Sequence, residues 1–132
     1  MKFMLMMHVP ATAPAGGGIM SWAPQEIKAH VQFMQDLNHD LRASGELVAA
    51  EGLDFPPRPR IVKARPGGEP LVTDGPFAET KELLVGFWIV QCDTPDRALA
   101  IAARASAAPG PGGAPINMPI EVREVMSAPP VG

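Results

Sequence analysis

Two stretches of the chain read as central strands of a sheet. In residues 2–9, apolar side chains alternate, with one side of the predicted strand formed by Phe3, Leu5, Met7 and Val9. The other side carries Met4, Met6 and His8, so both sides are largely apolar. Residues 83–92, "LLVGFWIVQC", form a second continuous apolar run that is rich in strand-forming residues. Strands of this kind are buried on both faces, so something must cover each side of the sheet.

Two other stretches predict helices. Over residues 24–45, a buried stripe with a period near 3.6 is traced by Ile27, Val31, Met34, Leu37 and Leu41. Pro24 suits the first turn of this helix, and Gly45 suits the position just past its end. A shorter helix is predicted over residues 93–106, with Asp93 or Thr94 as its N-cap.

The remaining strands complete a fold class. They are a strand at 46–53, a hairpin around Gly67-Gly68, and a closing strand in "MPIEVREVM" whose Ile120 and Val122 face inward while Glu121 faces out. The β-α-β-β-α-β order predicts an α+β, ferredoxin-like antiparallel sheet with both helices on one face. The other face is apolar and uncovered, which predicts a homodimer that packs sheet against sheet.

Composition limits the class of protein. With 132 residues, the chain is predicted to be one domain spanning 1–132. Its single cysteine excludes an internal disulfide and favours a cytoplasmic location. Three scattered histidines, without H-E-x-x-H or C-x-x-C, predict no metal site, and no phosphate-binding loop or other cofactor signature is present. A net charge of -3 argues against nucleic-acid binding, and no apolar run is long enough to span a membrane.

Two histidines are candidates for acid–base chemistry. His30 falls inside the apolar arc of the long predicted helix, so it is either a general base in a cleft or a structural histidine at the margin of the core. His8 shares a strand face with Met4 and Met6. If that face meets the helices, the two histidines approach each other. If it meets a second subunit, they are separated.

The stretch "TDGPFAET", residues 73–80, supplies a candidate carboxylate. Because Pro76 suits the first turn of a helix, Asp74 is predicted to cap a short helical turn. Asp74 is then either an ordinary loop former or the carboxylate partner of His30 or His8.

Other residues compete for a role at the site or belong to the surface. Glu51 and Asp54 are competing carboxylates, and Trp88 is either a core residue or a ligand contact. Glu79 and Glu82 are expected on a solvated face. The hairpin carries four cations, Arg58, Arg60, Lys63 and Arg65, which strand alternation divides between its two faces, as is typical of a charged edge strand.

Several segments together resemble a known family. They are "LVTDGPFAETKELLVGFWIV", the opening "MKFMLMM", "GELVAAEGL" and the closing "PIEVREV". The chain resembles the DGPF group of the YCII-related family. The resemblance implies a ferredoxin-like fold of the dimeric α/β-barrel type. Members of the wider family resemble small acid–base enzymes with a His and an Asp facing a cleft, a dehydrochlorinase among them. Some DGPF members are encoded beside extracytoplasmic-function sigma factors.

Two functional hypotheses follow. The first is a cofactor-free acid–base enzyme, lyase-like or hydrolase-like, that acts on a small molecule in a cleft of a homodimer. In it, His30 and Asp74 are catalytic, and the ligand is contacted by His8, Glu51, Asp54 and Trp88. The alternative is a non-catalytic protein that binds a small molecule or a regulatory partner such as a sigma factor. The sequence does not decide between them.

Overall fold

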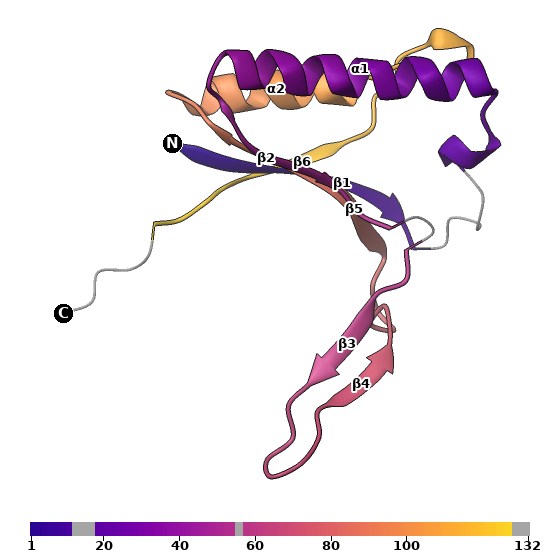
Figure 1. Cartoon of the computed structure of the whole chain (residues 1–132), viewed down its shortest axis with the longest axis vertical. Helices are drawn as coiled ribbons and strands as arrows, with labels where there is room; N and C mark the ends of the chain where they lie inside the picture. Colours follow the sequence, from indigo (N-terminus) through magenta and orange to yellow (C-terminus); the bar gives the residue numbers. More distant parts are fainter. Residues whose placement is uncertain (12–17, 55–56, 128–132) are drawn as a thin grey trace.

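The computed structural model describes residues 1–11, 18–54 and 57–127. Its elements, in chain order, are β1 Lys2–Pro10, the 3₁₀ turn η1 Gly18–Ser21, α1 Pro24–Ala43, β2 Leu47–Gly52, β3 Arg60–Lys63, β4 Leu71–Asp74, β5 Glu82–Gln91, α2 Pro95–Ser106, η2 Pro111–Gly113 and β6 Ile120–Glu124. Four of the strands form one antiparallel sheet in the order β2-β5-β1-β6. Both helices lie on the same side of this sheet (Figure 1). The predicted α+β class is confirmed, and the strand order is compatible with a ferredoxin-like fold.

The core lies between the sheet and the helices. Leu5 pairs with Trp88 and Phe3 with Val90 across β1 and β5, so these four side chains share one face of the sheet. They join a buried cluster with residues of α1 and α2, namely Leu37, Leu41, Ala98, Ile101, Ala102 and Ala105. Burial of this set removes large aliphatic and aromatic side chains from water, which is the main term that holds the layers together.

One residue of the stripe predicted for α1 is turned towards solvent. Leu37 and Leu41 are buried, Met34 packs against the core and Ile27 is half-buried, whereas Val31 is 43% exposed. The first half of α1 contacts the loop that follows α2 through His30.

The ends of the helices follow local rules. Past the end of α1, Gly45 has a φ of +79°, and the N–H of Glu46 donates to the carbonyl of Leu41 at 2.9 Å. This is a Schellman motif, in which the left-handed position favours glycine. At the start of α2, the hydroxyl of Thr94 accepts the N–H of Arg97, so of the two predicted caps Thr94 is the one used.

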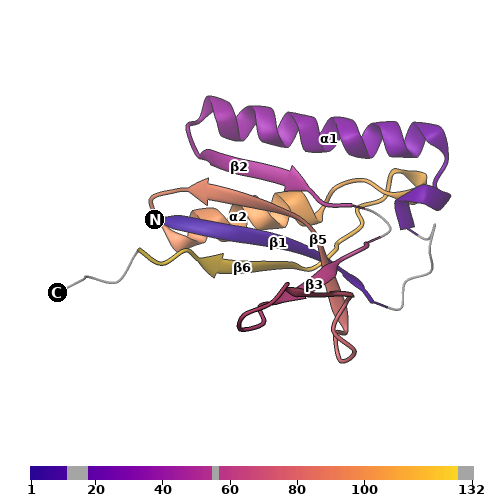
Figure 2. The ribbon, with the colours of Figure 1, turned by 60° about the horizontal axis from the view of Figure 1, so that its bottom comes forward.

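Residues 57–75 form what we call the arm. Its strands β3 and β4 pair with each other in a separate two-stranded sheet. The arm projects from the main sheet on the side away from the helices (Figure 1), and Figure 2 shows the four-stranded sheet with α2 behind it. The hairpin was predicted correctly, but both of its strands are edges of a sheet that stands apart.

The helical turn predicted after Asp74 is wrong. Asp74 is the last residue of β4 and pairs with Arg60, and the next N–H, that of Gly75, donates to the carbonyl of Pro59. The Gly75–Pro76 peptide is cis, and the chain then makes a turn closed by the N–H of Thr80 and the carbonyl of Phe77. The backbone groups at the end of β4 thus pair with the start of β3, and the chain rejoins the main sheet at Glu82.

Candidate functional site

His30 is engaged in a structural contact. Its Nδ1 lies 3.1 Å from the carbonyl oxygen of Pro109, and its ring meets Trp22 edge-on with centroids 5.4 Å apart. A carbonyl can only accept a hydrogen bond, so Nδ1 carries the proton. On the same helix, Glu26 accepts the N–H groups of Ala23 and Gly112. These bonds, with that from Gly112 the larger, lower the pKa of Glu26. His30 and Glu26 thus fasten α1 to the loop after α2.

Asp74 lies on the arm, on the other side of the sheet from α1 (Figure 1). It is exposed and lines a shallow pocket of about 310 Å³ beside Arg58 and Arg60. The predicted pair of His30 and Asp74 is therefore not brought together.

The sheet face opposite the helices, which we call the open face, carries the second histidine. Along β1, alternation puts Met4, Met6 and His8 there, because Phe3 and Leu5 point into the core. Pairing with Met6 places Phe87 of β5 and Glu121 of β6 on the same face. Further members by the same register are Ala49, Glu51, Ile89 and Arg123. His8 is thus separated from His30 by the sheet.

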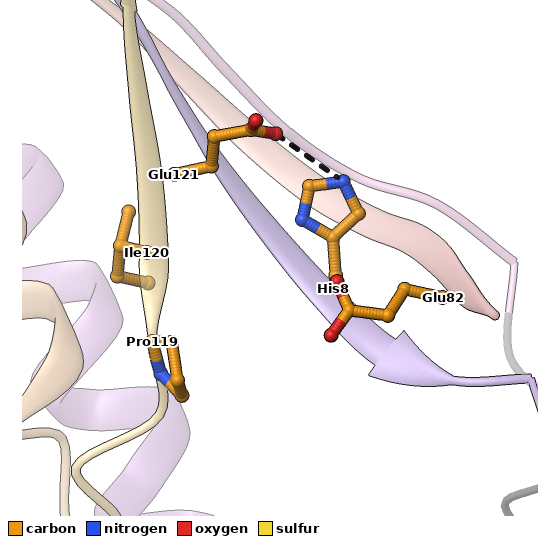
Figure 3. A pocket seen from close by; sticks show the side chains of 5 residues that line it. All are labelled: His8, Glu82, Pro119, Ile120 and Glu121. Atoms are coloured by element: carbon orange, nitrogen blue, oxygen red, sulfur yellow. Dashed lines mark ion pairs between the residues drawn. The ribbon is translucent and has the colours of Figure 1, made fainter.

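His8 faces a pocket at the end of the open face where β1 finishes. The pocket has a volume of about 390 Å³ and is lined by His8, Glu82, Pro119, Ile120 and Glu121. His8 Nε2 lies 3.8 Å from Glu121 Oε1, and the other ring nitrogen points to the side of Ile120 and Pro119 (Figure 3). Three strands supply the polar groups, since β1, β5 and β6 each contribute one. We take this pocket as the candidate site.

The pocket joins one imidazole to two carboxylates. A carboxylate beside a histidine orients the ring and stabilises the imidazolium that forms when the ring accepts a proton. At 3.8 Å, the His8–Glu121 contact is longer than a hydrogen bond, so the ring is not locked by Glu121 in this structure. The arrangement can therefore accept a proton from a bound molecule. It can also bind a small molecule through its polar groups without any proton transfer.

The other residues predicted for the site are dispersed. Glu51 is exposed on the open face, next to Phe87. Asp54 is exposed and accepts a hydrogen bond of 2.9 Å from the backbone N–H of Arg58. This bond connects Asp54 to the start of the arm. Trp88 is 5% exposed and donates Nε1–H to Asn38 at 2.8 Å. Trp88 is thus a core residue, away from the candidate site.

The largest carboxyl pKa shift occurs elsewhere. Arg97 donates two hydrogen bonds of 2.8 Å to Glu46, which lower the pKa of Glu46 to about 2. The pair joins the residue before β2 to the first turn of α2, beside a surface hollow of about 630 Å³. Cys92 lines the same hollow, but burial raises the pKa of its thiol, which disfavours the nucleophilic thiolate. The pair is an ordinary structural contact.

Glu82 and Glu121 are the site residues that sequence reasoning missed. The sequence alone places both on solvated faces. Their place beside His8 depends on the register, in which Met6 is opposite Glu121 and Pro10 is opposite Glu82. The outward alternation of Glu121 was the one available signal.

Neither a metal site nor a membrane-spanning helix is found in the described ranges 1–11, 18–54 and 57–127. No group of three or more His, Cys, Asp or Glu side chains there is placed to hold a metal ion. In the same ranges, no helix combines the length and hydrophobicity needed to cross a membrane.

Comparison with known proteins gives two findings. Residues 1–114 match the model of the YCII-related domain. In addition, 32 residues are 59% identical to a protein of Rhizobium meliloti (strain 1021) that is described as uncharacterized. That match covers 24% of this chain and 26% of the relative, so the chain spans about a quarter of the relative's length in the match.

Proposed function

The chain belongs to the YCII-related family, and we propose that it is a cofactor-free acid–base protein that acts on a small molecule in the His8 pocket. The observation that carries the proposal is the meeting of His8 with Glu121 in a concave site at the end of the open face. A histidine and a carboxylate within one pocket are the parts that proton transfer needs.

In this proposal His8 is the general base. The free ring nitrogen accepts a proton from a C–H or O–H group of the ligand, and Glu121 stabilises the resulting imidazolium. In a lyase reaction, the electron pair of the broken C–H bond forms a double bond and the leaving group departs from the neighbouring carbon with its own pair. Glu82 lines the same pocket and can accept a hydrogen bond from the ligand.

The proposal includes a homodimer. Half-buried apolar side chains lie on the open face, including Met4, Met6, Phe87 and Ile89. An uncovered apolar sheet face normally marks an interface. A second copy packed on this face would also cover one side of the His8 pocket and exclude water from it, which strengthens the electrostatic interactions inside.

A non-catalytic role is the second candidate. The 3.8 Å separation and the 56% exposure of the Glu121 side chain favour it, since neither group is preorganised as a catalytic pair requires. In this version the pocket binds a small molecule, or the open face binds a regulatory protein such as a sigma factor.

A thermal-shift screen with a panel of metabolites tests these functions. Any ligand that raises the melting temperature of the wild type is then tested on His8→Ala, with His39→Ala as the matched control because His39 is exposed on α1. We expect His8→Ala to abolish the shift and His39→Ala to keep it. A shift of the melting temperature that persists in His8→Ala would show that the ligand does not bind in the His8 pocket.

Turnover separates the two candidates. Each ligand found is incubated with the wild type, with Glu121→Gln and with the control Glu124→Gln, which alters an exposed carboxylate on the same strand. Product formation followed by proton NMR, with a loss of about a hundredfold in Glu121→Gln alone, is the expected result for acid–base catalysis. Binding without product in the wild type assigns the non-catalytic role.

A further inference from the structure

The arm leaves apolar side chains uncovered. It is a two-stranded sheet that stands apart from the main sheet, and an isolated hairpin of this size is at best marginally stable in water. On one of its faces the cross-strand pair Val62 and Val72 is 64% and 50% exposed. Leu71, on the other face, is 44% exposed. Contact with another surface would remove these side chains from water.

The open face of the same chain is also uncovered. Both helices lie on the opposite side of the sheet, and the arm projects on the side of the open face (Figure 1). The half-buried Met6 and Phe87 lie opposite each other on this face. Since the arm and the open face lie on the same side of the sheet, one occupant can cover both.

The two surfaces carry complementary charge. The arm has four cations, Arg58, Arg60, Lys63 and Arg65, against the two carboxylates of Glu69 and Asp74, a net charge of +2. Among the open-face residues that pair with Met4, Met6 and Phe87, the carboxylates of Glu51 and Glu121 outnumber the single cation, Arg123. The pocket at the end of the open face contains the carboxylates of Glu82 and Glu121.

We propose that the occupant is a second copy of this chain, whose arm lies over the open face and sets Arg60 against the carboxylates of Glu82 and Glu121. Arg60 shares an arm face with Val62 and with its cross-strand neighbour Asp74, so one approach delivers the apolar pair and the cation together. Within the described part of the chain, Arg60 has no ion-pair partner of its own.

Symmetry makes the second copy the favoured occupant. In a two-fold dimer, a contact from the arm of one copy to the open face of the other is repeated in reverse, so both uncovered surfaces are used twice. Each His8 pocket is then closed by a residue of the other copy. This inference rests on the dimer of the proposed function and adds the exchange of arms to it.

Apolar-to-acid substitutions test the contact of the arm. Val62→Asp is compared with the control Leu99→Asp. Leu99 is 54% exposed on α2, on the side of the sheet away from the arm. Sedimentation equilibrium should show the dimer dissociation constant raised at least about tenfold by Val62→Asp, because a charge is placed in a dry contact, and unchanged by Leu99→Asp. Unchanged dimerisation of Val62→Asp would overturn the proposal.

A third variant distinguishes a dimer without exchange of arms from the absence of any dimer. Met6→Asp charges the open face, and circular dichroism confirms that each variant is folded. If Met6→Asp dissociates the dimer while Val62→Asp does not, the two copies pack by their sheets and the exchange of arms is refuted. A monomeric wild type refutes both.

Charge reversal tests the partner of Arg60. Arg60→Glu should weaken the dimer about tenfold, whereas the control Arg104→Glu, which breaks an exposed pair with Asp40 on the helical side, should not. Combining Arg60→Glu with Glu121→Arg or with Glu82→Arg should restore the dissociation constant to within about threefold of the wild type. If neither combination restores it, the contact of Arg60 with the pocket is excluded.

Discussion

The carboxyl with the most perturbed pKa, Glu46, gives the most quantitative prediction. Strongly shifted pKa values often mark functional sites, but we assign Glu46 a structural role, because its partner Arg97 explains the shift. The perturbation is Glu46→Gln, which keeps the shape of the side chain and removes the charge.

The magnitude follows from the shift. A change from 4.5 to about 2 corresponds to an upper limit of about 3.4 kcal/mol at 1.36 kcal/mol per unit. The side chain of Arg97 is 49% exposed, so solvent screens the pair. We therefore expect about 1 kcal/mol at neutral pH.

The pH dependence has a definite sign. The folded-state pKa of Glu46 is depressed, so its stabilisation is fully present above pH 4.5 and is lost as the pH falls from there towards 2. Urea unfolding of the wild type and Glu46→Gln at several pH values measures the difference. Asp40→Asn is the control, because the Asp40–Arg104 pair is exposed on both sides and should contribute less than about 0.5 kcal/mol. A wild-type advantage that is absent at pH 7, or that grows as the solution is acidified, would refute the assignment.

Three further predictions test the packing on the helical side of the sheet. His30→Ala should lower the free energy of unfolding by about 1–2 kcal/mol through its lost hydrogen bond and aromatic contact, and should leave binding in the His8 pocket unchanged in the thermal-shift assay. Gly110→Ala would bring a Cβ to 2.8 Å from Ile116 Cγ1 and should cost about 1–3 kcal/mol in urea unfolding, whereas Gly52→Ala, with open space around it, should be tolerated. Cys92 should react slowly with a thiol reagent in the folded protein and rapidly in urea, because it is buried; fast reaction of the folded form would contradict its place in the core.

The fold was largely predictable because its signals are local and redundant. Each element can be recognised without reference to the rest of the chain. Alternation predicts β1, a 3.6-residue period that ends at Gly45 predicts α1, and Thr94 before Pro95 predicts the start of α2. The error at Val31 arose because a periodic stripe does not say whether a helix packs on a sheet or on a loop. The error at Pro76 arose because the same residues suit a helix start and a turn, and only the backbone pairing at the end of β4 decides.

The site was less predictable because it depends on register. His8 was a candidate from its strand, and alternation gave it two faces to choose from. Glu121 lies 113 residues further along, and its approach to His8 is fixed by the pairing of Met6 with Glu121 across β1 and β6. The preference for His30 reflected its apolar setting, which the structure explains by Pro109 and Trp22.

Sedimentation velocity of the wild-type protein at low micromolar concentration tests the central claim most directly. The account predicts a species of twice the 14.0 kDa chain mass, because in the proposed dimer a second copy covers the apolar open face and the exposed arm. A single species of 14.0 kDa at every concentration up to the millimolar range would contradict it.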